Sequence, residues 1–259
     1  MSLLSARPFV MLYIHLRTLF AYPKEMLISY LTLPIQLIVM VSLFDYLSRF
    51  YIGRVDYVVS LCYIILAAFY TRILFLEDVS ITIANDVFNG FIDKYLTKPM
   101  NILTPYVYRS YARRLFGLTI LIPTALIALY VFKLKVSLYR LLLFIALSHL
   151  SYALNFLINC TIGFLSIYTH RVYGIKDVLD TINFILSGQL LPIYMYPEPV
   201  KLIAMYMPFQ AIVYVPLKAL LIGVDVKAIA MSLLYMLVLS LALLIIIKSF
   251  SRRYESAMG

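Results

Sequence analysis

The sequence contains few charged residues, and this shortage decides the class of protein. Asp, Glu, Lys and Arg make up 13% of the 259 residues, whereas hydrophobic residues make up 64%. Soluble domains are about one quarter charged and about half apolar, so a soluble globular fold is excluded. The apolar runs are continuous rather than alternating, which excludes a membrane β-barrel. Because a backbone in lipid has to satisfy its own hydrogen bonds, we expect an all-α polytopic membrane protein.

Motifs for several kinds of catalysis are also absent. No GxxxxGK[ST] phosphate-binding loop occurs, none of the eight glycines falls in a GxGxxG pattern, and the three histidines have no HExxH spacing. No paired carboxylates lie within one apolar span. We therefore expect a chain that is not an enzyme and that has no catalytic, cofactor-binding or metal site of its own.

The two cysteines and the basic excess have simple explanations. Cys62 and Cys160 lie in separate apolar runs, and we expect them to be small core residues in opposite leaflets rather than a disulfide. The net charge is +10, but no basic cluster of the kind that binds nucleic acid is present. Lys and Arg instead flank the apolar runs, where they would meet lipid headgroups.

The apolar pattern predicts two parts. Residues 1–22 are expected to form an interfacial amphipathic helix, whose basic residues are Arg7 and Arg17. Residues 23–259 are expected to form one transmembrane domain with six spans. These spans cover residues 26–47, 57–76, 114–132, 138–167, 178–191 and 227–247. The distribution of Lys and Arg then places both termini in the cytoplasm, in a multi-pass protein of the plasma membrane.

The sequence also predicts a structural role for several polar or helix-breaking residues in and beside the spans. Pro34 is expected to kink the first span. Arg72 is expected to snorkel to the headgroups or pair with Glu77, and Arg114 to snorkel. The carboxylates of Asp177 and Asp180 would cap the start of the fifth span.

The fourth span carries a row of polar residues at helical spacing. Such a row either forms an interhelical hydrogen-bonding face or lines a substrate path. Its members are His149, Tyr152, Asn155 and Asn159.

Residues 77–101 form the longest polar segment, and we expect this loop to be cytoplasmic. Residues Phe88, Phe91, Ile92, Tyr95 and Leu96 follow helical periodicity on one apolar face. This predicts a helix over residues 86–96 that Asn85 or Asp86 caps and that ends before Pro99. The helix either rests on the bilayer or contacts a protein. Asp86 and Asp93 favour a protein partner, because carboxylates are repelled by an anionic membrane.

Residues 192–222 are apolar but repeatedly broken by proline, at Pro192, Pro197, Pro199, Pro208 and Pro216. The uninterrupted pieces are too short to cross a hydrocarbon core of roughly 30 Å. We expect short re-entrant or surface-lying helices on the external side.

Three stretches resemble type-2 ABC transporter permeases, in the branch of the daunorubicin-type exporters. In the loop, the matching residues are Ile83, Gly90, Ile92, Leu96, Lys98, Pro99 and Asn101. In the proline-rich region, they are Ser187, Gly188, Pro192, Pro197, Pro208, Phe209, Tyr214, Pro216 and Gly223. The tail SRRYESAMG resembles the closing segment of these permeases, whereas the EAA…G motif of importer permeases is absent.

The resemblance implies a permease that acts as a homodimer or with a close paralogue. Its partner would be a separate ABC ATPase subunit, which would hold the ATP and Mg²⁺. The loop would act as a coupling helix that docks this ATPase through Asp86, Phe88, Gly90, Phe91, Asp93, Leu96 and Pro99. The outer gate would include Gly188, Pro192, Pro208, Phe209 and Pro216.

Two other functions remain open from the sequence. The chain is alternatively a non-transporting assembly or regulatory protein that recruits a cytoplasmic partner. An ATP-independent channel or carrier is less supported, because the two halves show no clear similarity. Since few charges lie in the spans, an amphipathic or lipid-like cargo is favoured over an ion or a sugar.

Overall fold

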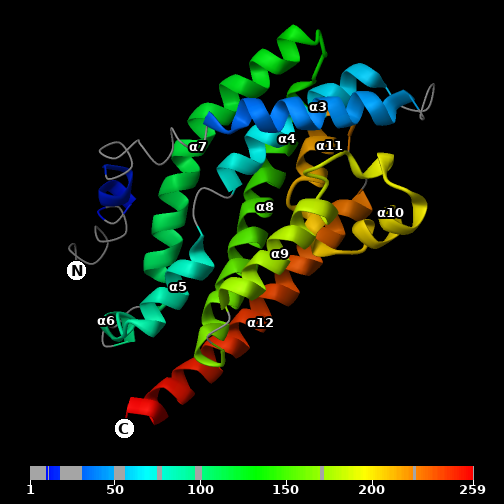
Figure 1. The fold of residues 1–259 in the computed structure, drawn as a ribbon. Helices are drawn as coiled ribbons and strands as arrows, with labels where there is room; N and C mark the ends of the chain where they lie inside the picture. Colours follow the sequence, from blue (N-terminus) through cyan, green and yellow to red (C-terminus); the bar gives the residue numbers. More distant parts are fainter. Residues whose placement is uncertain are drawn as a thin grey trace.

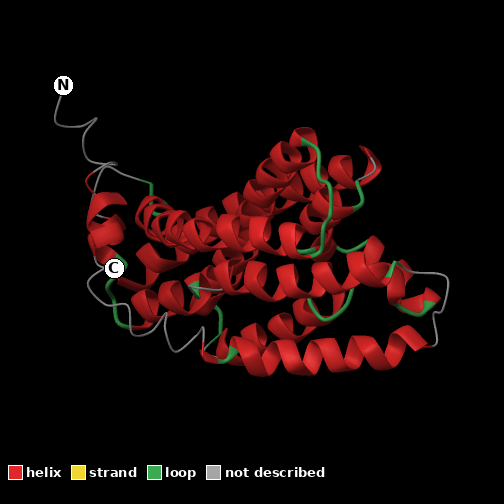
Figure 2. Ribbon diagram, turned by 90° about the horizontal axis from the view of Figure 1, so that it is seen from above, coloured by secondary structure: helices red, strands yellow, loops and turns green. Residues whose placement is uncertain are grey.

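The computed structural model describes residues 10, 12–17, 31–49, 56–74, 78–96, 101–169, 172–223 and 226–258. For residues 251–258 and a few others, including Leu96, it describes the backbone alone. These residues are helical and contain no strand, and short loops join the helices (Figure 2). The all-α prediction is therefore confirmed for the described chain. The main helices are α3 (Leu33–Ser48), α4 (Tyr57–Leu74), α5 (Val79–Phe88), α6 (Asp93–Leu96), α7 (Thr104–Val131), α8 (Leu138–Phe164), α9 (Val172–Leu186), α10 (Glu198–Met205), α11 (Tyr214–Leu221) and α12 (Val226–Met258).

Among the described residues, three helices are long and apolar enough to cross a membrane. They are α7, α8 and the Val226–Phe250 part of α12, and they correspond to the predicted third, fourth and sixth spans. The helices α3, α4 and α9 contain 16, 18 and 15 residues, fewer than the roughly 20 that a span needs. The described chain thus supports three of the six predicted spans by length and composition.

A helix break lies just before Pro34: Leu31 is helical, Thr32 is a turn, and α3 begins at Leu33. The part of the predicted span before Leu31 lies outside the described residues, so the kink at Pro34 stays a prediction. The start of the third span differs from the prediction, because proline is compatible with the first turn of a helix. The helix α7 begins at Thr104, with Pro105 in its first turn, and not at Arg114. Arg109 and Arg113, which lie before the predicted start of the third span, are therefore part of α7.

The helix α8 forms the centre of the molecule. It packs against α5, α11 and α12, while α4 packs against α3, α7 and α11. Figure 1 shows α5, α6 and the carboxyl end of α12 at one end of the bundle, with α10 and α11 toward the other and α3 lying across it. The loop segment and the proline-broken region are thus well separated.

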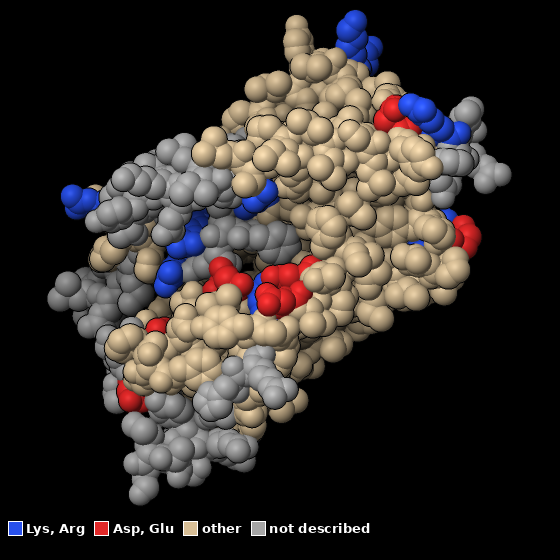
Figure 3. Space-filling model, viewed as in Figure 1, with Lys and Arg blue, Asp and Glu red and all other residues tan. Residues whose placement is uncertain are grey.

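Charged side chains are few on the face of the bundle that Figure 3 shows. The helix α12 exposes Leu233, Leu237, Leu241 and Leu244, and lipid is the solvent that accommodates such a surface. The cysteines Cys62 and Cys160 are buried and free, as predicted.

Candidate functional site

The polar loop forms two helices rather than one. Asp78 is the N-cap of α5, and its Oδ1 accepts a hydrogen bond from the Ile81 amide at 3.2 Å. The helix ends at Phe88, and Gly90 follows with a φ of +70°. Glycine adopts this left-handed conformation at no steric cost and is the usual residue after a helix end. The prediction of one helix over 86–96, capped by Asn85 or Asp86, is therefore wrong.

The apolar face predicted for this segment is divided between the interior and the surface. Ile92 is fully buried, and the Tyr95 ring meets the Tyr106 ring edge-on with centroids 5.7 Å apart. Phe88 and Phe91 are exposed, at 38% and 57%. The segment therefore has an inner side that packs on the bundle and an outer side that carries two aromatic rings.

The two predicted docking carboxylates differ in their surroundings. Asp86 accepts a hydrogen bond from the Tyr106 hydroxyl at 2.8 Å, which joins α5 to the start of α7. Asp93 is the first residue of α6 and is half-buried. Pro99 and the Leu96 side chain lie outside the described residues.

The helix α5 is packed directly onto α8 at a glycine. A Cβ placed on Gly163 would lie 2.8 Å from the Ile83 Cβ and 3.0 Å from the Ser80 carbonyl oxygen. Ser80, Ile83 and Ala84 are all fully buried. The absence of a side chain at Gly163 therefore allows the two helices to approach closely.

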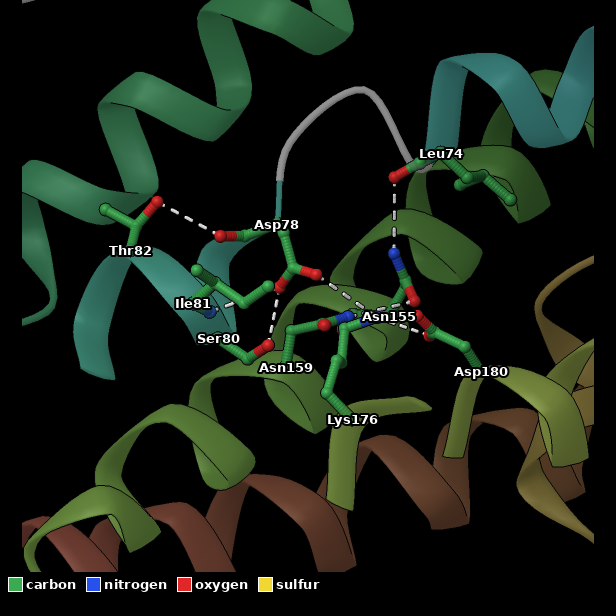
Figure 4. A network of polar contacts seen from close by, with 9 residues as sticks. All are labelled: Leu74, Asp78, Ser80, Ile81, Thr82, Asn155, Asn159, Lys176 and Asp180. Atoms are coloured by element: carbon green, nitrogen blue, oxygen red, sulfur yellow. Dashed lines mark hydrogen bonds and ion pairs between the residues drawn. The ribbon is translucent and has the colours of Figure 1, made fainter. Parts of the chain in front are cut away.

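A buried lysine links α5 to α9 (Figure 4). Lys176 is 5% exposed, and its Nζ lies 3.4 Å from Asp78 Oδ2 and also donates to Asp180 Oδ1. Burying a lysine is costly unless carboxylates compensate its charge. The sequence analysis did not single out Lys176, although its spacing of four residues from Asp180 was the available signal.

The expected capping role of Asp177 and Asp180 is wrong. The helix α9 begins at Val172, so both carboxylates lie inside it. Asp180 instead pairs with Lys176, and the Asp177 carbonyl accepts a hydrogen bond from the Thr181 hydroxyl at 2.9 Å.

The polar row of α8 is only partly brought together. Asn155 donates to the Leu74 carbonyl at 3.3 Å, and Asn159 donates to the Asn155 carbonyl at 2.8 Å and to Asn155 Oδ1 at 3.2 Å. His149 is exposed, and its Nδ1 lies 2.8 Å from the Ile145 carbonyl of its own helix. Asn155 thus bonds to another helix, whereas His149 does not share that contact.

Tyr152, the remaining member of this row, contacts a buried arginine. The Arg114 guanidinium lies 4.7 Å from the Tyr152 ring centroid, and its Nη2 lies 3.2 Å from Ser148 Oγ. Arg114 is 2% exposed, so the predicted snorkelling is wrong. A cation over an aromatic face is attracted by the ring quadrupole, which helps to explain how α7 tolerates this charge.

Arg72 also has a partner other than the predicted one. It donates to Thr32 Oγ1 at 2.7 Å and to Gln36 Oε1 at 2.9 Å, and thereby joins α4 to α3. Glu77 lies outside the described residues.

The proline-broken region forms short helices, as predicted. Between α9 and α12 lie the 3₁₀ turns Ile193–Met195 and Pro208–Ala211 and the helices α10 and α11. Gly188 has a φ of +82°, and its carbonyl accepts a hydrogen bond from the Tyr63 hydroxyl at 2.8 Å. The other proposed gate residues lie at the starts of these pieces or within them: Pro192 before the first turn, Pro208 and Phe209 in the second, and Pro216 buried in α11.

The predicted interfacial helix is described in part. Residues 12–17, including Arg17, are helical, whereas Arg7 lies outside the described residues. Burial and then the positive charges of Arg109 and Arg113 lower the pKa of His15 below its ordinary value. The first helix therefore lies near the initial turns of α7.

Comparison with known proteins gives one family. The model of a family described as ABC-2 family transporter protein matches residues 24–258. This supports the predicted permease family and does not support the daunorubicin-type branch. No curated protein matches the chain.

Proposed function

Because the chain belongs to the ABC-2 family of transporter proteins, we propose that it is the permease subunit of an ABC exporter. A separate ATPase would bind ATP and Mg²⁺ and dock on the cytoplasmic end of the bundle. Two copies of the chain, or the chain and a close paralogue, would enclose the transport path. Both termini would lie in the cytoplasm, and the protein would reside in the plasma membrane.

The packing of the α5–α6 segment is the observation that carries this proposal. The outer side of the segment presents Phe88 and Phe91, while its inner side is fixed to α8 by the contact between Ile83 and Gly163. An exposed aromatic pair is typical of the residues that anchor protein–protein interfaces. The segment thus has the properties of a rigid element that receives force from a partner and passes it to the membrane helices.

Three further features support an externally powered exporter. The sequence has no phosphate-binding loop, so the energy has to come from another polypeptide. The EAA…G motif of importer permeases is absent. The broken helices α10 and α11 lie toward the end of the bundle away from α6 (Figure 1), where an outer gate is required.

Affinity purification from native membranes tests the proposal. The tagged chain, extracted in mild detergent, is expected to retain an ATPase that carries a phosphate-binding loop, together with a second permease copy. ATP hydrolysis by that complex should be inhibited by vanadate. Isolation of the chain as a monodisperse species without an ATPase would contradict the proposed function.

A further inference from the structure

A pocket lies between α5, α8 and α9, beside the ion pairs of Lys176. Its volume is about 410 Å³, within the range of roughly 300–1,000 Å³ that small-molecule sites occupy. Asp78, Asn159, Asp180 and Phe184 are among the residues that line it. Figure 3 shows acidic side chains gathered near the middle of this face, next to a hollow.

The charges of the described residues that line the pocket do not cancel. Lys176 contacts both Asp78 and Asp180, so one positive charge faces two negative charges. The sum of these three charges is −1, opposite in sign to the net charge of +10 of the whole chain. Both carboxylates are partly accessible, with side chains 33% and 50% exposed, whereas the lysine side chain is 6% exposed. The accessible charge of the pocket is therefore negative.

The neutral polar groups of the pocket also offer acceptors. The Asn155 amide nitrogen donates to the Leu74 carbonyl, which fixes the orientation of this side chain and leaves its Oδ1 to accept from Asn159 (Figure 4). The Asn159 nitrogen is thus engaged, and its Oδ1 keeps the capacity to accept a hydrogen bond. Thr181, another lining residue, donates its hydroxyl hydrogen to the Asp177 carbonyl and keeps its acceptor lone pairs.

An aromatic ring completes the lining. Phe184 is 36% exposed, one helical turn beyond Asp180. Its face attracts a cation, and its area accommodates an apolar body. Gln189 also lines the pocket and offers both a donor and an acceptor. Anions are disfavoured, since they would meet the two carboxylates.

We propose that this pocket binds an amphipathic organic cation, whose charged group interacts with Asp78 and Asp180 and whose apolar body packs on Phe184. That the cation is exported cargo rests on the proposed function, whereas the binding itself does not. Asp78 also caps α5, so a cation that competes with Lys176 for Asp78 acts on the helix that leads to α6.

Two probes of the same shape and opposite charge test this inference. The full chain, reconstituted in phosphatidylcholine nanodiscs without an ATPase, is titrated with radiolabelled tetraphenylphosphonium and, separately, with tetraphenylborate. Saturable binding of the cation alone is expected. Equal or tighter binding of the anion would show hydrophobic partition and overturn the proposal.

Three variants locate the site. Asp180→Asn should weaken tetraphenylphosphonium binding roughly tenfold, because a charge-assisted contact is lost. Asp45→Asn is the matched control, since Asp45 also pairs with a basic residue four positions away, Arg49, and is equally exposed at 50%; its binding should equal that of the unmodified chain. Lys176→Gln removes the competing cation and should tighten binding, a gain that misfolding cannot produce.

The results separate the two proposals. Unchanged affinity in both Asp180→Asn and Lys176→Gln would overturn the cation site while leaving the ATPase interaction intact. Cation binding without a co-purifying ATPase would retain the site and contradict the exporter.

Discussion

Ile83 of α5 and Gly163 of α8 are in direct contact, with only 2.8 Å between the Ile83 Cβ and the position that a Cβ on Gly163 would occupy. This contact joins the α5–α6 segment to the central helix of the bundle. The position requires glycine because of this close approach.

Gly163→Ala should destabilise the protein, although replacing a helical glycine by alanine ordinarily stabilises a helix by about 0.5–1 kcal/mol. The added methyl group would force α5 away from α8, at a cost of about 1–3 kcal/mol for overpacking. Unfolding in mixed micelles measures the change. Gly174→Ala in α9 is the control, because nothing lies within 4 Å of its added Cβ, and it should be neutral or stabilising. Equal effects of the two substitutions would contradict the proposed contact.

Asp78 both caps α5 and pairs with Lys176, and two substitutions separate these roles. Asp78→Asn keeps a side-chain acceptor for the Ile81 amide but loses the ion pair, whereas Asp78→Ala loses both. The alanine variant should therefore be less stable than the asparagine variant by about 1 kcal/mol, the usual value of an N-cap. Hydrogen exchange should show faster opening of the first turn of α5 in Asp78→Ala. Identical exchange in both variants would rule out the capping role.

The hydrogen bond from Tyr106 to Asp86 fixes α5 to α7. Tyr106→Phe leaves the Asp86 carboxylate without this donor, and we expect a loss of about 1.5–3 kcal/mol, as for other hydrogen bonds to charged groups. A double-mutant cycle with Asp86→Ala, which removes the acceptor, measures the coupling energy by unfolding in mixed micelles. A coupling energy of zero would mean that the two groups do not interact.

The predicted topology places the two ends of the bundle on opposite sides of the membrane. Both natural cysteines are buried, so an introduced cysteine should react selectively with a membrane-impermeant maleimide. Phe91→Cys should be labelled only after permeabilisation, whereas Lys135→Cys, in the α7–α8 loop, should be labelled in intact cells. Labelling of position 91 from outside would reverse the topology.

The sequence predicts those features of the structure that depend on long apolar runs and on proline. The runs around α7, α8 and α12 predict long helices, and Pro192, Pro197 and Pro208 predict the broken region before α12. These signals are local, so they can be read without knowledge of the packing.

Features that depend on contacts between distant residues escape the sequence analysis. The start of α9 at Val172 was missed because its first turns are polar, and their partner, Asp78, lies on another helix. Likewise, Arg114 resembles a snorkelling residue until the structure places Ser148 and Tyr152 beside it. The break at Gly90 was missed because the apolar periodicity of residues 88–96 continues through it.

The most direct test of the central claim measures ATPase binding by a permease altered at the tip of its α5–α6 segment. We predict that Phe91→Glu lowers the amount of co-purifying ATPase roughly tenfold or more, as expected for an aromatic anchor of an interface, and that Asp93→Lys lowers it as well. Tyr139→Glu, at an exposed aromatic residue in the first turn of α8, should retain the ATPase in full. Recovery of the ATPase with Phe91→Glu at the level of the Tyr139→Glu control would show that force does not enter the permease through this segment.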